Sequence, residues 1–173
     1  MIYSFFPSVE LSFQIATPAD ASELVRLHTT VNEHLTSIYG RGPWSSGSTE
    51  KGVLFSMRNA KVCLGRERDK LIATFRLCTK KPWAIDKTYF SACKRPLYLT
   101  SMAVHPGHQR QSAGTRCIQE ARRIAAAWPG DAIRLDAFDA AAGAGEFYRK
   151  CNFREVGRTS YRNAPLIYFE MLL

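Results

Sequence analysis

The chain has 173 residues, 46% of them hydrophobic and 23% charged, and a formal net charge of +9 at pH 7. This length and composition favour a single domain over residues 1–173 with one apolar core. No run of about 18 apolar residues occurs, which excludes a membrane-spanning helix. The apolar segment at residues 1–7 lacks the basic start of a signal peptide, so we expect a cytoplasmic protein.

The cysteines and the basic residues are both scattered along the chain. The five cysteines include no Cys-x-x-Cys pair, which argues against a metal site or a disulfide framework and predicts reduced thiols. Basic residues occur as isolated doublets such as Lys80-Lys81 and Arg122-Arg123, separated by apolar segments. Nucleic-acid binding is therefore an alternative supported by net charge alone, because no basic stretch marks a binding face.

Apolar periodicity and turn residues predict strands alternating with helices. Thr-Pro-Ala-Asp at residues 17–20 is typical of a helix start, because Thr caps the first turn and Pro fits its first position. A break rich in Gly and Pro follows this helix at residues 40–43. The predicted elements are strands at 11–16, 62–64, 71–78, 97–104, 135–139, 154–161 and 166–172, and helices at 17–35, 48–58, 112–128 and 140–151.

The most informative stretch is Val-His-Pro-Gly-His-Gln-Arg-Gln-Ser-Ala-Gly-Thr at residues 104–115, where a predicted strand ends and a predicted helix begins. The first turn of a helix has unpaired backbone N–H groups and the positive end of the helix dipole. This turn therefore predicts a site for phosphate. Small residues at 112–114 allow close approach to the backbone, and the side chains of residues 109–111 add hydrogen-bond donors.

A second stretch, Ala-Gly-Glu-Phe-Tyr-Arg-Lys-Cys-Asn-Phe at residues 144–153, follows the next predicted strand. Ala144 and Tyr148 are four residues apart and so share one face of a helix. The stretch at 104–115 resembles the acyl-CoA-binding motif of GNAT N-acetyltransferases, Arg/Gln-x-x-Gly-x-Gly/Ala after Val-x-Pro. The second stretch resembles a later motif of the same family, Ala-x-x-x-Tyr-x-x-x-Gly-Phe.

The chain departs from these family motifs at three positions. Ser112 and Asn152 stand where the family usually has Gly, and Ala141 stands where it often has Asn. Ser is small and suits a helix start, so we expect Ser112 to weaken phosphate binding without abolishing it. Asn tolerates the left-handed conformation that ends a helix, so Asn152 can take over the backbone role of Gly.

The resemblance spans nearly the whole chain and implies a single acetyltransferase-like domain. It implies an α/β (α+β) fold, with a central mixed sheet of about six to seven strands flanked by about four helices. In the family, the strand that corresponds to residues 100–104 bulges and separates from its neighbour, and its backbone binds the pantetheine arm of acetyl-CoA. The tyrosine at the position of Tyr148 protonates the departing thiolate, and no metal is involved. The residues implied for acetyl-CoA are Met102, Ala103, Val104, Gln109, Arg110, Gln111, Ser112, Ala113, Gly114, Thr115, Ala144 and Phe147.

The function implied is acetyl-CoA-dependent N-acetyl transfer to a primary amine of a small molecule or a protein. The amine attacks the thioester directly, so residues such as Ser101, Cys117 and Cys151 need not act as nucleophiles. A non-catalytic acyl-CoA-binding module is the alternative, because of the departures at Ser112 and Ala141 and a missing carboxylate. A homodimer is compatible with the resemblance.

The general base for the amine is not evident in the sequence. Family members often have a carboxylate on the central strand, but residues 97–102 contain none. Glu33, His34 and His105 are candidates to accept the proton through water. Ordinary surface or capping roles are the alternative for each of them.

The long connection at residues 80–96 is the expected cover of the acceptor pocket. Loops of this length are often functional, and large aromatic residues are costly to expose. The alternative is that its aromatic residues pack on the fold and contact no ligand. The residues expected on the acceptor side, from this loop and from the first helix, are Trp83, Tyr89, Phe90, Glu33, His34 and Tyr39.

Overall fold

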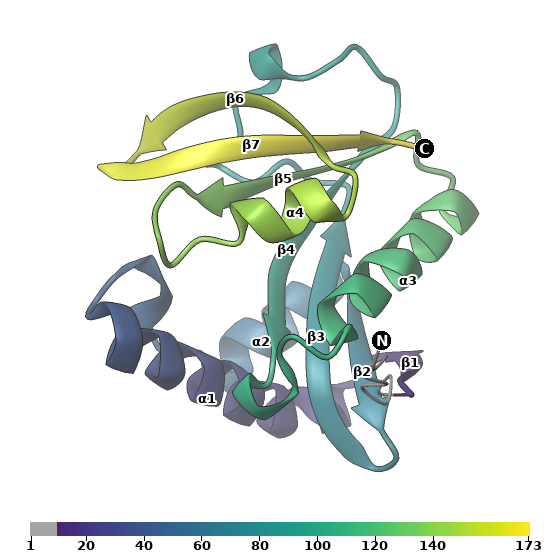
Figure 1. The fold of residues 1–173 in the computed structure, drawn as a ribbon. Helices are drawn as coiled ribbons and strands as arrows, with labels where there is room; N and C mark the ends of the chain where they lie inside the picture. Colours follow the sequence, from purple (N-terminus) through teal and green to yellow (C-terminus); the bar gives the residue numbers. More distant parts are fainter. Residues whose placement is uncertain (1–9) are drawn as a thin grey trace, which may run out of the picture.

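The computed structural model describes residues 10–173, which form one sheet with helices on both faces (Figure 1). This range contains seven strands and four α-helices, which confirms the predicted mixed sheet and its flanking helices. The elements are β1 (Ser12–Ile15), α1 (Ala21–Tyr39), α2 (Glu50–Arg58), β2 (Lys61–Glu67), β3 (Lys70–Cys78), β4 (Pro96–Val104), α3 (Ala113–Ala127), β5 (Ala132–Phe138), α4 (Gly145–Lys150), β6 (Arg154–Tyr161) and β7 (Ala164–Leu172).

The sheet has the strand order β1-β2-β3-β4-β5-β7-β6. Neighbouring strands are antiparallel except β4 and β5, which are parallel. A parallel pair needs a long crossover connection, and α3 supplies it. Only residues 96–98 of β4 pair with residues 132–134 of β5, although both strands continue further. Figure 1 shows β4 leaving β5 beyond this point, so backbone groups on that edge of β4 have no partner on β5.

On its other side, β4 bulges against β3. Between the pairs Thr74–Ala103 and Arg76–Thr100, β4 has one residue more than β3. Ser101, within this bulge, has a φ of 51°, in the left-handed region that is unfavourable for residues other than glycine. Such bulges redirect side chains next to functional sites. The resemblance implied both the bulge and the separation of the strands, and the structure has both.

The two faces of the sheet have separate hydrophobic cores. Under α3 and α4, the core combines residues such as Ile118, Phe153 and Phe169. Under α1 and α2, it combines residues such as Leu24 and Leu64. α1 and α2 are therefore held against β2, β3 and the end of β4, while α3 and α4 pack on the opposite face and flank the point where β4 and β5 separate.

The predicted start of the first helix is confirmed. The Asp20 carboxylate accepts a hydrogen bond from the Thr17 backbone N–H at 2.8 Å, and a short 3-10 turn over Pro18–Asp20 leads into α1. At the other end, Gly40 has a φ of 74° and ends the helix where the glycine- and proline-rich break was predicted. Both ends of α1 thus follow from local sequence.

The predicted helix at residues 140–151 was too long, because α4 begins only at Gly145. The chain first makes a tight turn, in which the Gly143 N–H donates to the Ala140 carbonyl at 2.8 Å. A Cβ atom on Gly143 would lie 1.7 Å from the carbonyl oxygen of Phe138, so this turn requires glycine. Asn152, after the helix, has a φ of 66°, the left-handed conformation predicted for it.

Several remaining expectations concern the chain as a whole. The five cysteines are free thiols, and burial raises the pKa of Cys117 to about 12. Among residues 10–173, no helix is both long enough and apolar enough to cross a membrane. The apolar segment at residues 1–7 lies outside the described residues.

Candidate active site

A cleft of about 590 Å³, here called the β4–α3 cleft, lies where β4 separates from β5. Its walls come from the end of β4, the start of α3, the turn before α4, and α1. Tyr39 of α1, which was expected in the acceptor pocket, lines this cleft. Most of the predicted site residues line it as well: Met102, Ala103, Val104, Gln109, Arg110, Ser112, Gly114, Thr115, Ala144, Phe147 and Tyr148.

Gln111 and Ala113 are the two predicted site residues that do not line the cleft. The Gln111 side-chain amide donates to the Gly107 carbonyl at 3.1 Å and so stabilises the turn itself. Ala113 is buried in a small cluster with Leu11 and Ile72. Their side chains therefore do not face the cleft, because the turn uses one internally and the core uses the other.

The turn that leads from β4 into α3 has a backbone suited to anions. Arg110 and Ser112 have φ values of 60° and 65°, so two nearby residues are left-handed. Left-handed residues are common in backbone turns that bind anions. α3 begins directly afterwards at Ala113, one residue later than predicted, and adds the free N–H groups of its first turn. The φ of Ser112 also explains why the family motif has Gly at this position.

Two side chains fix the shape of this turn and its helix. The Gln109 side-chain amide donates to the Val104 carbonyl at 3.1 Å, which braces the turn. Gly114 lies against the Phe147 ring: a Cβ atom here would be 3.0 Å from two ring carbons. α3 therefore approaches Phe147 closely only because residue 114 is Gly. Arg110 is exposed and brings a positive charge to the cleft.

Tyr148 lies in the wall of the cleft and is 9% exposed. Its hydroxyl donates to the Met102 sulfur at 3.9 Å. Its backbone N–H donates to the Ala144 carbonyl at 3.1 Å, so the two residues form one helical turn, as their spacing indicated. Burial raises the pKa of Tyr148 above its usual value of 10.0, which keeps the phenol protonated at physiological pH. The site thus contains a protonated hydroxyl beside a sulfur atom.

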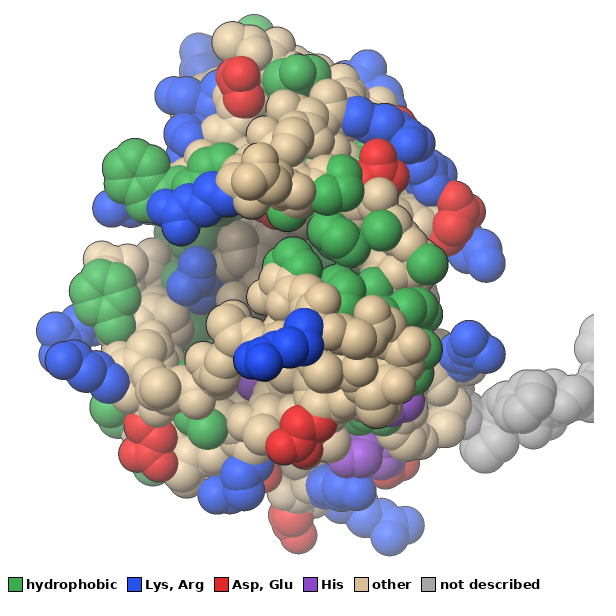
Figure 2. Space-filling model, turned by 90° about the vertical axis from the view of Figure 1, so that its left-hand side faces the viewer, with side chains coloured by type: hydrophobic (Ala, Val, Ile, Leu, Met, Phe, Trp, Pro, Cys, Tyr) green, Lys and Arg blue, Asp and Glu red, His purple; other side chains and the backbone are tan. Residues whose placement is uncertain are grey.

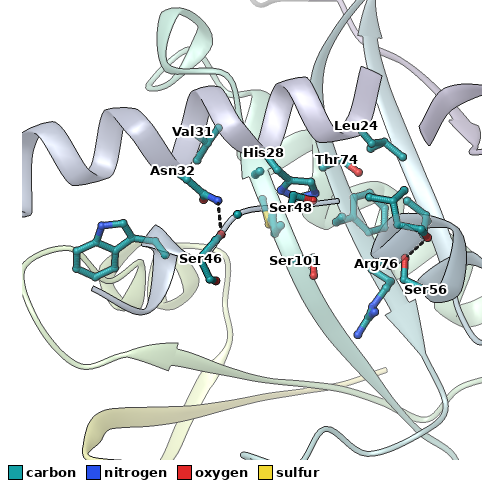
Figure 3. A pocket seen from close by; sticks show the side chains of 18 of the residues that line it. Leu24, His28, Val31, Asn32, Ser46, Ser48, Ser56, Thr74, Arg76 and Ser101 are labelled. Atoms are coloured by element: carbon teal, nitrogen blue, oxygen red, sulfur yellow. Dashed lines mark hydrogen bonds between the residues drawn. The ribbon is translucent and has the colours of Figure 1, made fainter. Parts of the chain in front are cut away.

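A second cavity of about 490 Å³, here called the α1–α2 cavity, lies between these helices and the bulge of β4 (Figure 3). It shares four lining residues with the β4–α3 cleft: Val31, Leu35, Met102 and Ala103. The two spaces therefore meet at the bulged part of β4. Figure 2 shows the molecule hollowed between its upper and lower parts on one face.

The α1–α2 cavity contains two chemically active side chains that sequence reasoning missed. His28 lies on α1 between Leu24 and Val31, within the apolar face of the helix, and that position is the signal that could have identified it. Burial lowers the pKa of His28 below 6.5, so the imidazole is neutral at pH 7. Arg76 is half-buried, and its Nε donates to Thr100 Oγ1 at 2.8 Å.

The bases suggested by the sequence lie elsewhere. Glu33 and His34 line neither the cleft nor the cavity. His105 accepts a hydrogen bond from the Gly107 N–H at 3.1 Å through Nδ1, which is the capping role considered as its alternative. Asp136 on β5 is half-buried, and burial raises its pKa, but it also lines neither space. His28 is the titratable side chain in the α1–α2 cavity.

The expectation for the connection at residues 80–96 was wrong, because none of its residues lines the cleft or the cavity. Phe90 is buried, with its ring centre 5.4 Å from that of Tyr168. Tyr89 packs edge-on against the same ring at 5.3 Å. Trp83 is 84% exposed. Tyr89 and Phe90 therefore follow the packing alternative on the outer part of the sheet, whereas the Trp83 side chain neither packs on the fold nor lines the cleft or the cavity.

Solved structures with the same fold include several described as acetyltransferases. A GNAT-family acetyltransferase from Listeria monocytogenes has a TM-score of 0.72 and 18% identity, with 95% of this chain and 97% of that chain covered. A ribosomal-protein-alanine N-acetyltransferase from Brucella melitensis has a TM-score of 0.70 and 14% identity, with coverage of 94% and 100%. A PaiA N-acetyltransferase from Thermoplasma acidophilum, in complex with coenzyme A, has a TM-score of 0.67 and 12% identity, with coverage of 92% and 98%.

Identities of 12% to 18% show a shared fold. They do not indicate that this chain acts on the same substrates as those proteins. The chain matches no curated protein sequence. A family model described as "Acetyltransferase (GNAT) family" matches residues 28–153, which include the bulged strand, the turn between β4 and α3, and Tyr148. On this match and the fold that accompanies it, the chain belongs to the GNAT acetyltransferase family.

Proposed function

We propose that the protein is an acetyl-CoA-dependent N-acetyltransferase that binds acetyl-CoA in the β4–α3 cleft and a primary amine in the α1–α2 cavity. The observation that carries this proposal is the meeting of the two spaces at the bulge of β4, around Met102 and Ala103. A thioester at this junction would be reachable by an amine from the other space. Direct transfer needs the thioester and the amine held in contact, and the junction of the two spaces can hold them so.

The donor's phosphates fit the turn before α3, where Ser112 and Arg110 bend the backbone and Arg110 adds positive charge. The pantetheine arm carries amide groups, and the unpaired edge of β4 offers backbone donors and acceptors for them. The structure of the Thermoplasma acidophilum protein, which has the same fold and was solved with coenzyme A, supports this choice of donor.

The transfer itself needs two proton movements. The amine nitrogen attacks the thioester carbon, the carbon–sulfur bond breaks, and the sulfur leaves with the bond's electron pair. Tyr148 can give its proton to this thiolate, because its phenol is protonated and lies in the cleft wall beside Met102, which lines both spaces. His28 can accept the proton that the amine loses, because its imidazole is neutral and borders the cavity.

Mixing the protein with acetyl-CoA and a panel of amines tests this proposal. We expect free CoA and acetylated amine to form in equal amounts, measured by thiol titration and mass spectrometry. Binding of acetyl-CoA in calorimetry without turnover of any amine would support a non-catalytic acyl-CoA-binding module. Salt-sensitive binding of oligonucleotides, with no binding of acetyl-CoA, would support the nucleic-acid alternative.

A further inference from the structure

The α1–α2 cavity has an unusual charge balance for a site that is to receive an amine. Among the described residues that line it, Arg76 is the one with a permanent charge, and none is Asp or Glu. The residues that line the β4–α3 cleft also include no carboxylate. Amines that carry several positive charges are bound by carboxylates, so this pair of spaces does not suit them.

Arg76 is a shielded arginine without an ionic partner. Among the buried and half-buried arginines of residues 10–173, Arg66, Arg134 and Arg149 form ion pairs with a carboxylate, and Arg76 and Arg116 do not. Of these two, only Arg76 lines the α1–α2 cavity. Within residues 10–173, Arg76 makes no ion pair, and its side chain donates one hydrogen bond, from Nε to Thr100 Oγ1. A half-buried guanidinium without an anion is unfavourable unless a ligand supplies one.

The hydrogen bond to Thr100 leaves the two Nη atoms of Arg76 free to bind. It also limits rotation of the guanidinium, since Nε is held at 2.8 Å from the Thr100 hydroxyl. The Nη donors form a planar fork that matches the two oxygens of a carboxylate. Figure 3 shows Arg76 from β3 and Ser101 from β4 on the side of the cavity opposite His28. A ligand that spans the cavity would reach both Arg76 and His28.

The rest of the cavity suits a small polar molecule. Its lining includes uncharged hydrogen-bonding side chains, among them Asn32, Ser48 and Ser101. A volume of about 490 Å³ lies in the range typical of small-molecule sites. The absence of carboxylates among the lining residues also disfavours the protonated amine and so favours its neutral, nucleophilic form.

We infer that the acceptor is a small amine that also carries a carboxylate, as an amino acid does, and that Arg76 binds this carboxylate. The inference rests on the proposed function and names its substrate class. Arg76 holds the acid end against β3 and β4, and the amine end lies toward the junction with the β4–α3 cleft. His28, on α1, is then within the same cavity to take the amine proton.

The first experiment uses matched acceptors with the wild-type chain and acetyl-CoA. A panel of amino acids is compared with the corresponding carboxamides, decarboxylated amines and aminophosphonates, and with spermidine. We expect kcat/KM for the best amino acid to exceed that for its carboxamide by at least about 100-fold, the size of effect for losing a charge-assisted bidentate pair. Preference for spermidine or for neutral amines would overturn the inference, and preference for the phosphonate would overturn the assignment to a carboxylate.

The second experiment changes Arg76 and a matched arginine. Arg76→Gln should raise KM for the amino acid by about 100-fold and remove the preference over the carboxamide. Arg122→Gln, on the exposed side of α3, removes the same charge and should leave both unchanged. Arg76→Glu should favour a cationic acceptor. Thermal unfolding checks that each variant folds, and retained preference for the amino acid in a folded Arg76→Gln protein would overturn the inference.

The two proposals can fail separately. If no amine of any charge is acetylated although acetyl-CoA binds, the proposed enzymatic function fails. If neutral or cationic amines are acetylated efficiently and Arg76→Gln changes nothing, the enzyme stands and the carboxylate inference fails.

Discussion

The two spaces of the candidate active site are built in different ways. The β4–α3 cleft comes mainly from two short stretches, residues 102–115 and 141–148, and its binding features are largely backbone features. The α1–α2 cavity gathers side chains from α1, α2, β3 and β4, and its chemistry depends on single side chains such as His28 and Arg76. In the proposed function, the cleft binds a constant donor and the side chains of the cavity select the acceptor.

This difference also separates the effects expected of mutations. Changes in the cleft should act on acetyl-CoA, and changes in the cavity should act on the amine or on the rate of transfer. A cleft variant that changed only amine binding, or a cavity variant that changed only acetyl-CoA binding, would show that the two substrates do not bind as proposed.

The largest effect is expected from Gly114→Glu. A side chain here meets the Phe147 ring at 3.0 Å, and its negative charge would lie near the phosphates. Calorimetry should show acetyl-CoA affinity reduced by about 100-fold or more, since repulsion of about 3 kcal/mol at this range has that consequence. The control is Gly47→Glu in the α1–α2 cavity, where an added Cβ meets no atom within 4 Å. Its donor affinity should match the wild type, and equal losses in both variants would argue against the cleft as the donor site.

His28→Gln should lower kcat/KM by about 100-fold, the lower end for loss of a general base. Burial lowers the pKa of His28 below 6.5. The wild-type kcat at saturating amine should therefore rise with pH along an acid limb below pH 6.5. The variant should lose this limb. His34→Gln, which changes a residue outside both spaces, should leave the profile intact.

The lowered pKa of His28 also makes the free energy of unfolding decrease as the pH falls. The unfolded chain binds a proton at His28 more readily than the folded chain does, because only the folded state has the lowered pKa. The contribution of His28 to stability should thus be lost as the pH falls below 6.5. Denaturant unfolding of wild type and His28→Gln at pH 7 and pH 5 measures it, and a wild-type loss no larger than that of the variant would contradict the assignment.

Tyr148→Phe should lower kcat by about 10-fold while leaving acetyl-CoA affinity nearly unchanged, because only a proton donor is removed. The phenyl ring keeps the packing against Phe153 and Phe169. Tyr161→Phe, in a strand away from both spaces, is the control. An unchanged kcat, with chemistry shown to limit the rate, would assign Tyr148 to packing alone.

The smallest effect is expected from Ser112→Gly. Ser112 has a φ of 65°, and Gly takes this conformation without the cost of about 1 kcal/mol that other residues incur. The melting temperature should rise by about 2–4 °C, and acetyl-CoA affinity should be preserved or tightened. Ser112→Ala keeps the conformational cost and should give no such rise. A drop in affinity for the Gly variant would show that the Ser112 hydroxyl itself binds the donor.

The sequence predicted elements whose limits depend on local chemistry. Residues 17–20 start α1 and Gly40 ends it because caps and glycine act within a few bonds. The length of α4 was overestimated because the obstacle at Gly143 is the carbonyl of Phe138, five residues earlier. Helical spacing among small residues contains no sign of that contact.

By itself, the sequence determined the order of elements, the turn between β4 and α3 and the position of Tyr148, because each depends on neighbours along the chain. Only the tertiary structure decided which side chains share the α1–α2 cavity. His28 and Arg76 are 48 positions apart, and they line one cavity because α1 packs over β3 and the bulge of β4. The structure likewise placed Phe90 against Tyr168 rather than over the site. Periodicity reveals which face of an element is buried, but the partner of that face depends on how the whole core packs.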